Sequence, residues 1–463
     1  MESWEMAGLW WLPDQPESRV VGQVRYSSDD GFRLEIPFGF LGALREGAMP
    51  IDPPPVPSVR GLLKNGKCAT LFNVIRTNFS INMPGAGSEE YYAGLGYVGP
   101  AEIDADPLID AVHVSYTFLR DWVAQRAGVA EHDPQAQSVS YHYDAPDAEE
   151  IAAKEGWTLS LTHTHGTSFP SQAGFELTHD CAFRLELAPP LDFHELQEKL
   201  LTTLWQFLSF CMNQKTSTRV LRVRRHGGDE WFDVFIHQGP MQDTQKALPR
   251  SRMLLSRPEL GDRISSVLGA WLEAAEDQRR GMSLLDGLIS WRGVPLDLEF
   301  LAAVQALEAL ARVGRSDLDM NESEFKKWLG MVLDPVKKGH GKEWAEDKLR
   351  YANRKSAREL FKGLFADIGP YVGSLAKDGK RMLNEIMDNR NFYTHRDDRD
   401  KRHILEGEEL FVLTQAVILL LKAAVLHLLG FSQEETSAIM EGCDGTRQWR
   451  SQVSQRYGGD ELC

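Results

Sequence analysis

The sequence predicts an α+β protein with several domains, in which a strand-rich, antiparallel N-terminal half precedes an all-α helical bundle. Three observations support this. The chain has 463 residues, more than a single hydrophobic core usually serves. Short runs of β-branched and aromatic residues, separated by Gly, Pro, Asn and Asp, fill the chain up to about Pro190. From Pro295 onward, apolar residues recur at intervals of three and four, which is the period of an amphipathic helix.

Composition and charge narrow the class of protein. Apolar residues make up 42% of the chain and charged residues 25%, as in a soluble globular protein. The net charge of −16 argues against a surface that binds nucleic acid indiscriminately, because Lys and Arg supply most of that affinity. Residues 1–290 carry 25 basic against 39 acidic side chains, whereas residues 291–463 carry 26 against 28. Residues 325–362 hold 11 basic and 5 acidic side chains, a local excess that could face phosphates.

Period-two patterns predict strands in residues 1–190, which we assign to one strand-rich domain. A twisted antiparallel sandwich or barrel is the natural arrangement for such strands. The four prolines of Asp52–Pro57 predict an extended loop. The clearest strand patterns are Val20–Tyr26, Phe32–Pro37, Cys68–Phe79, Val112–Phe118, Ser138–Tyr143, Thr158–His163 and Phe183–Leu187.

Residues 191–290 mix the two periods. After Asp192, which can serve as an N-cap, apolar residues at helical spacing predict one long amphipathic helix. The strands Arg219–Val223 and Trp231–Ile236 are expected next, followed by a charged helical stretch, Arg263–Arg279. This part is either a continuation of the first domain or a connecting subdomain.

Residues 291–463 are expected to form the helical domain. Apolar stripes in Leu298–Arg312 and Leu410–Leu428 predict two facing core helices. The longest apolar run includes Lys422 and His427, so a buried bundle helix fits it better than a membrane span. The N-terminus lacks the basic start and the apolar run of a secretory signal. The sequence therefore predicts a cytoplasmic protein with no membrane contact.

Signals for metal or cofactor binding are weak. The five cysteines are widely separated and form no CxxC pair, so neither a disulfide framework nor a zinc finger is indicated. His163 and His165 would share one face of a strand, and together with His179 they could bind zinc. Without a clearly spaced carboxylate or thiolate, ordinary strand surface is the favoured interpretation. We expect no metal and no cofactor.

The strongest chemical signal is Asn389–Asp397 (NRNFYTHRD), which places Arg390, Asn391 and His395 within six residues. Internal phosphoryl transfer in RNA needs a base for the 2′-hydroxyl, an acid for the leaving 5′-oxygen and positive charge at the phosphorane. Histidine titrates near neutrality, and the arginine fork fits two phosphate oxygens. The segment therefore suits RNA cleavage, and this chemistry requires no metal.

The spacing alone is weak evidence, because an isolated RxxxxH is most often part of a charged, solvated face. On a regular helix Asn391 and His395 share a face, whereas Arg390 and His395 are about 140° apart. A site that uses both residues predicts a bend or a helix end near Arg390.

Several segments together resemble the HEPN superfamily, specifically the ApeA-like branch of prokaryotic antiviral defence. Leu298–Arg312 is similar to the first core helix of that family, with its central Glu308. Arg390–His395 (RNFYTH) matches the family motif of arginine, a polar residue, three variable residues and histidine. Phe411–Leu429 is similar to the closing apolar helix. The N-terminal half, beginning Gly8–Pro13 (GLWWLP), resembles the strand-rich domain that precedes the nuclease domain in ApeA-like proteins.

The resemblance implies a metal-independent endoribonuclease of anti-phage defence, acting by abortive infection, with an N-terminal domain that senses infection or restrains the nuclease. It implies that Arg390 stabilises the phosphorane, that His395 transfers protons, and that Asn391 orients the histidine or the phosphate. Glu308 is either a supporting residue near the motif or a structural residue that pairs helices. Attack by the 2′-hydroxyl would leave a 2′,3′-cyclic phosphate.

The resemblance also implies partners. A second subunit is expected to complete the active site, in a homodimer or a larger homo-oligomer. The expected substrate is host RNA, and transfer RNA is a candidate because side chains reach unstacked nucleotides in single-stranded loops. A phage-encoded protein is the expected trigger. The candidates for contact with the RNA backbone are Lys337, Lys338, Arg396 and Arg399.

Two other functions remain open. Some members of the superfamily have lost their chemistry and serve as nucleotide-binding or assembly modules, and the intact Arg390, Asn391 and His395 argue against that role here. The strand-rich, acidic half could instead belong to a ligand-binding β-sandwich that dimerises through its helices.

Overall fold

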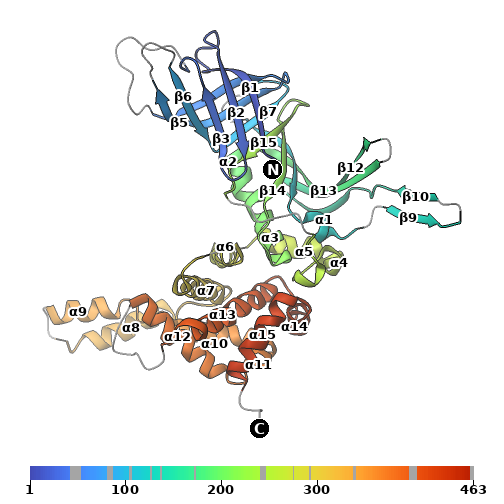
Figure 1. Ribbon diagram of the computed structural model, residues 1–463. Helices are drawn as coiled ribbons and strands as arrows, with labels where there is room; N and C mark the ends of the chain where they lie inside the picture. The colour runs from blue at the N-terminus through green and yellow to red at the C-terminus, as the bar shows by residue number, and fades with distance from the viewer. Residues whose placement is uncertain are drawn as a thin grey trace. The chain divides into compact units, whose positions relative to one another are not determined.

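The computed structural model describes residues 1–41, 54–80, 87–103, 107–125, 128–135, 138–171, 174–239, 247–274, 276–290, 293–336, 340–395 and 404–458. The chain divides into two compact units. Unit 1 comprises Met1–Leu208, Lys215–Arg250 and Ser256–Leu272, and unit 2 comprises Ser209–Gln214, Ser251–Leu255 and Glu273–Cys463. Unit 1 is rich in strands and unit 2 is helical, which confirms the predicted α+β multidomain class (Figure 1).

Unit 1 is built on one large antiparallel sheet. Its strands lie in the order β11-β12-β13-β8-β14-β15-β7-β5-β4-β1-β2-β3-β6, and β9 and β10 form a separate ribbon. Each strand expected from a period-two pattern overlaps an observed one. The strands are β1 (Trp4–Trp11), β2 (Val20–Ser27), β3 (Gly31–Ile36), β4 (Val56–Leu63), β5 (Cys68–Ser80), β6 (Ser88–Ala93), β7 (Leu95–Gly99), β8 (Ile109–Tyr116), β9 (Gly128–Asp133), β10 (Ser138–Tyr143), β11 (Glu149–Lys154), β12 (Trp157–Ser171), β13 (Gly174–Leu191), β14 (Thr218–Arg225) and β15 (Trp231–Ile236).

One end of this sheet closes into a barrel, because β5 also pairs with β6. The beginning of β5 pairs with β7, and its end, from Ile75 onward, pairs with β6, with a register irregularity between Arg76 and Asn78. Large apolar side chains, Trp10, Tyr26 and Phe32 among them, fill the interior. A Cβ atom on Gly61 would lie 2.5 Å from the Trp10 ring, so that position on β4 has no room for a side chain.

The proline-rich segment differs in part from the expected loop. Asp52 and Pro53 lie outside the described residues, whereas Val56 and Pro57 already belong to β4. A proline is tolerated there because it stands at the start of the strand. The expected loop is therefore wrong for its last two residues.

Short helices complete unit 1. Asp192 is an N-cap as predicted, since its side chain accepts a hydrogen bond from the Glu195 amide at 2.9 Å. The long helix expected after it is present and runs without a break from Phe193 to Met212, as α2, a π-helical turn (η1) and α3. The helical segments are α1 (Leu119–Val123), α2 (Phe193–Leu196), η1 (Gln197–Leu201), α3 (Thr202–Met212), η2 (Arg250–Arg252), α4 (Arg257–Leu260), η3 (Gly261–Arg263) and α5 (Ile264–Leu272), with the ends of α3 and η2 in unit 2.

Unit 2 is a bundle in which α13 packs against α7, and α7 against α6. α13 is the one described helix that is long and apolar enough to cross a membrane, and 78% of its most apolar window is buried within the protein. Its burial agrees with the predicted bundle helix. The helices are α6 (Glu276–Ser290), α7 (Leu296–Arg312), α8 (Glu322–Leu333), α9 (His340–Leu349), α10 (Ala357–Asp367), α11 (Gly369–Leu375), α12 (Gly379–His395), α13 (Gly407–Leu428), α14 (Gln433–Gly442) and α15 (Asp444–Tyr457).

Candidate active site

The motif lies on α12, which runs without interruption from Gly379 to His395. The bend or helix end expected near Arg390 is therefore wrong, since the helix ends five residues later. The reason is that the core-facing stripe of Met382 and Ile386 continues through Asn389 to Tyr393, so packing and hydrogen bonds hold the last turns in helical form.

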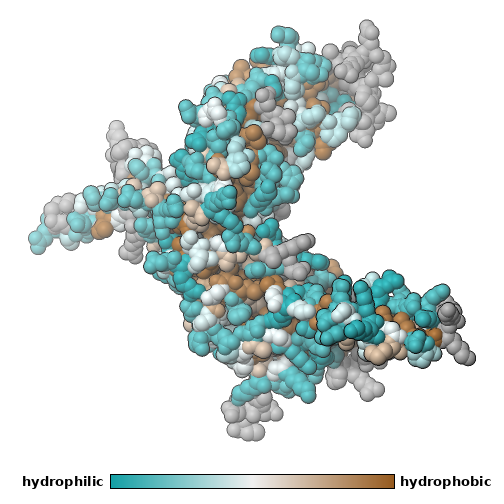
Figure 2. All heavy atoms as spheres, turned by 180° about the vertical axis from the view of Figure 1, so that it is seen from behind, coloured by the Kyte–Doolittle hydropathy of each residue, from teal (hydrophilic) through white to brown (hydrophobic). Residues whose placement is uncertain are grey.

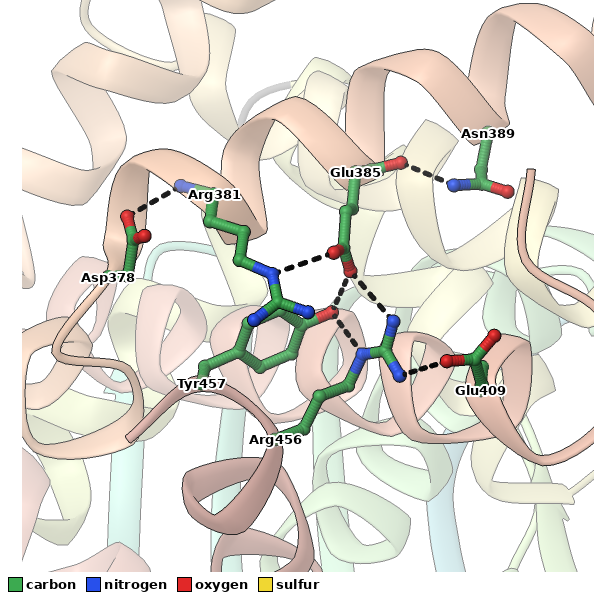
Figure 3. Close-up of polar contacts among 7 residues, drawn as sticks. All are labelled: Asp378, Arg381, Glu385, Asn389, Glu409, Arg456 and Tyr457. Carbon is green, nitrogen blue, oxygen red and sulfur yellow. Dashed lines mark hydrogen bonds and ion pairs between the residues drawn. The ribbon is translucent and has the colours of Figure 1, made fainter. Parts of the chain in front are cut away.

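A polar network fixes the first half of α12 (Figure 3). Glu385 accepts hydrogen bonds from Arg381 Nε at 3.0 Å, from the Tyr457 hydroxyl at 2.7 Å and from Arg456 Nη2 at 3.2 Å. Burial alone would raise the pKa of Glu385, but these donors outweigh it and the net pKa is lowered. Arg456 also pairs with Glu409 on α13 at 2.8 Å, so the network joins three helices.

A second set of contacts fixes the last turns of α12. The Asn389 side chain is fully buried, and its Oδ1 accepts a hydrogen bond from the Leu405 amide at 2.7 Å. Its Nδ2 donates to the Glu385 carbonyl at 2.8 Å. The Tyr393 hydroxyl donates to the Leu405 carbonyl at 2.7 Å. The backbone N–H and C=O groups of Leu405 are therefore both bound to α12, which fixes Leu405 against the last turns of the helix.

Arg390 is held beside α7 by Glu308. Arg390 Nη2 lies 3.4 Å from Glu308 Oε2, and Arg390 Nη1 donates to Asn391 Oδ1 at 3.2 Å. Glu308 Oε1 binds Arg312 at 2.8 Å, and this hydrogen bond is the main cause of a raised pKa for Arg312. Glu308 is therefore shared by two guanidinium groups. It approaches the motif and also joins α7 to α12, so both roles considered for it from the sequence have a structural basis.

Arg390 keeps donors for a further ligand. Its side chain is 31% exposed, and the two contacts above use two of the five N–H groups of a guanidinium. The other three have no partner among the residues that the structure describes. An arginine whose guanidinium is oriented by a carboxylate, and whose other N–H groups have no acceptor, is able to bind a phosphate through those N–H groups.

His395 is the exposed last residue of α12. Asn391, one turn earlier, is also exposed. Arg390 and His395 stay about 140° apart around the helix and about 7.5 Å apart along it, because the helix is regular. Arg390 is directed towards α7 by Glu308. A single chain therefore presents the arginine and the histidine on different faces of α12.

The residues expected to contact the RNA backbone, Lys337, Lys338, Arg396 and Arg399, lie outside the described residues. Parts of the surrounding basic segment are described. α8 and α9 lie side by side and project from the rest of unit 2 (Figure 1). Seen from behind, this pair of helices is mostly hydrophilic with a few apolar side chains among the polar ones (Figure 2). Trp344 on α9 and Tyr351, two residues after that helix, are each 60% exposed.

Sequence reasoning missed Asn389, Tyr393 and Arg312. A signal for Asn389 was present, since it falls at helical spacing on an otherwise apolar stripe, where a buried amide must find partners. Arg312 lies one turn after Glu308, the spacing at which opposite charges pair on a helix.

Two family models match the chain. The model of the ApeA N-terminal domain 1 matches residues 5–271, and the model of the Apea-like HEPN domain matches residues 301–435. No match was found among curated proteins or among solved structures.

Proposed function

Because the chain belongs to the ApeA-like HEPN proteins, we propose that it is an antiviral-defence endoribonuclease whose active site is built from the Arg390–His395 motif. The observation that supports the proposal most directly is how the side chains of Arg390 and His395 are positioned and exposed on α12. Arg390 is positioned by Glu308 but retains unused N–H groups, and His395 is exposed at the end of the helix. Both side chains are accessible to a substrate, whereas Asn389 and Leu405, which hold the last turns of the helix, are buried.

The proposed reaction uses the 2′-hydroxyl of the RNA as nucleophile. His395 removes the proton of that hydroxyl or protonates the leaving 5′-oxygen, and Arg390 stabilises the negative charge of the phosphorane. Asn391 positions Arg390 through the hydrogen bond at 3.2 Å. The bond from phosphorus to the 5′-oxygen breaks as the bond to the 2′-oxygen forms. The products are a 2′,3′-cyclic phosphate and a 5′-hydroxyl, and no metal is required.

We further propose that the working site is shared between two chains. His395 and Arg390 leave α12 on different faces, so one helix does not bring both to the same phosphate. Two α12 helices related by a twofold axis would place the arginine of one motif beside the histidine of the other. A homodimer, or a larger assembly of such dimers, is the simplest arrangement that supplies both groups.

The projecting pair α8 and α9 is the proposed contact for the rest of the RNA. Lys326 and Lys348 on these helices, and Arg350 just after α9, are exposed and could contact phosphates. Trp344 and Tyr351 are exposed aromatic rings on which unpaired bases could stack. Unpaired bases are available in single-stranded loops, so a transfer RNA is a reasonable substrate.

In this proposal, unit 1 restrains the nuclease in the cytoplasm until a phage-encoded protein binds it, and the activated nuclease then causes abortive infection.

The test is to sequence RNA ends from phage-infected cells that express the wild type, His395→Ala or Arg390→Ala. Two matched variants serve as controls: His427→Ala, in the last turn of α13, and Arg447→Ala, an exposed arginine of α15. We expect discrete new ends with a 2′,3′-cyclic phosphate for the wild type and both controls, and none for the two motif variants. The same ends in His395→Ala, or 5′-phosphate ends in the wild type, would contradict the mechanism.

The alternative is a non-catalytic HEPN module that binds a nucleotide or assembles a complex. The same expression experiment separates the two functions, because such a module would bind RNA or nucleotide in a filter-binding assay without producing new ends.

A further inference from the structure

Two histidines and a cysteine meet on one face of the long β12–β13 hairpin in unit 1. In the antiparallel ladder His163 lies opposite Cys181, and His165 lies opposite His179. Opposite residues share a face of the sheet, and so do residues two apart on one strand. All four side chains therefore start from the same face, and those of His163, His179 and Cys181 come together there.

The ligand atoms of the three residues are spaced as a tetrahedral metal ion requires. His163 Nδ1 lies 3.0 Å from His179 Nε2, and Cys181 Sγ lies 3.5 Å and 4.0 Å from these two nitrogens. Zinc bonds of about 2.05 Å to nitrogen and 2.3 Å to sulfur, at tetrahedral angles, place two nitrogens about 3.3 Å apart and nitrogen and sulfur about 3.6 Å apart. Small side-chain adjustments are enough to reach these spacings.

The surroundings are also those of a metal site. Cys181 is only 1% exposed, while both histidines are partly exposed, so the cluster is closed on one side and open on the other. The Tyr143 ring lies beside His179, at 5.8 Å between ring centroids, and the Tyr143 hydroxyl is buried without a hydrogen-bond partner among the described residues. Such an unpaired polar group can bond to a water that completes the coordination of an ion.

Metal binding also requires a particular protonation state of each ligand. A neutral imidazole binds a metal through a nitrogen lone pair, and a cysteine binds it as the thiolate. A metal that binds here therefore displaces the proton of the Cys181 thiol.

We propose that His163, His179 and Cys181 bind one Zn²⁺ ion, with a water molecule in the fourth position. Nitrogen and thiolate ligands in tetrahedral geometry are typical of zinc. Binding forms a zinc–sulfur bond and releases the thiol proton to solvent. The ion joins β12 to β13 within the domain proposed to receive the trigger, so it stabilises that hairpin and takes no part in the RNA cleavage proposed for unit 2. The competing explanation is a single hydrogen bond between the two imidazoles, with no ion.

The test uses the purified full chain. Its zinc content is measured by mass spectrometry, and the metal-free protein is then titrated with Co²⁺, whose visible spectrum reports tetrahedral geometry and thiolate bonding. We expect about one zinc per chain and a thiolate-to-cobalt charge-transfer band. Cys181→Ser should remove that band, and His163→Ala and His179→Ala should each weaken cobalt binding by about 100-fold.

Three controls make the result decisive. His165→Ala removes a histidine from the same face, and Cys68→Ser removes a partly exposed cysteine of β5. Both should keep the metal. His395→Ala should also keep it, which separates this inference from the proposed nuclease. If Cys181→Ser does not fold, as judged by circular dichroism, the two histidine variants carry the test. A wild type without stoichiometric metal, a charge-transfer band that survives in Cys181→Ser, or equal loss in His165→Ala would overturn the assignment.

Discussion

Replacing Asn389 by alanine tests whether the end of α12 is held from within. In the wild type the buried amide oxygen accepts the Leu405 amide proton at 2.7 Å. Leu405 is itself only 7% exposed, so in Asn389→Ala its N–H group would be buried without a partner. Leaving a buried donor unsatisfied costs about 1–3 kcal/mol, and the lost packing of the amide adds to that cost. We expect unit 2 to lose about 2–3 kcal/mol of unfolding free energy.

That loss has a measurable size. For a domain of about 150–250 residues, 1 kcal/mol shifts Tm by about 2–4 °C, so the helical unit should melt about 4–12 °C lower. The assay is scanning calorimetry together with hydrogen exchange of the peptide that contains Leu405, whose amide should exchange faster. Asn391→Ala, on the exposed face of the same helix, is the matched control and should leave Tm unchanged. A shift below about 2 °C for Asn389→Ala, with Leu405 still protected, would refute the reasoning.

Three further predictions concern unit 2. Burial lowers the pKa of Lys422 from 10.5 to about 8, so its charge is unfavourable in the folded protein below pH 8. The wild type should therefore gain up to about 3 kcal/mol relative to Lys422→Met between pH 8 and pH 10.5, measured by denaturant unfolding, and a constant difference would contradict this. Glu308→Gln should slow RNA cleavage while changing stability by less than about 1 kcal/mol, because its pair with Arg390 is partly exposed. A large loss of stability with unchanged cleavage would show a purely structural role. Mixing Arg390→Ala and His395→Ala chains should restore some cleavage if the site is shared, and a monomer by light scattering that cleaves RNA would rule out sharing.

The fold was predictable where the signal is local. Every strand predicted from a period-two pattern overlaps an observed strand, and the helical patterns predicted the two facing helices α7 and α13. These patterns are informative because they report which face of an element is buried. The closure of the barrel was not predictable, since β5 pairs with β4, β6 and β7, and such pairings depend on contacts distant in sequence. The π-helical turn at Gln197–Leu201 was likewise not predictable from the spacing of the apolar residues.

The candidate site was likewise predictable only where the signal is local in the sequence. Residue types identified Arg390, Asn391 and His395, because the chemistry of phosphate and proton transfer restricts the choice. The course of α12 beyond Arg390 depends on Asn389 bonding to a residue 16 positions away, which the motif does not show. The cysteine that completes the cluster with His163 was missed because its place opposite that histidine is set by the register of the β12–β13 hairpin.

The division of the chain into units has a practical consequence for dissecting the protein. The chain passes between the units five times, at 208/209, 214/215, 250/251, 255/256 and 272/273. Asn213, in one of the short crossing segments, accepts a hydrogen bond from Lys422 of α13 at 2.7 Å. A protease that cuts one connection would leave the halves joined by the others, and a shortened chain beginning at residue 291 would lose α6 and both crossing segments. Testing the proposed roles of the two units separately therefore calls for point substitutions in the intact chain.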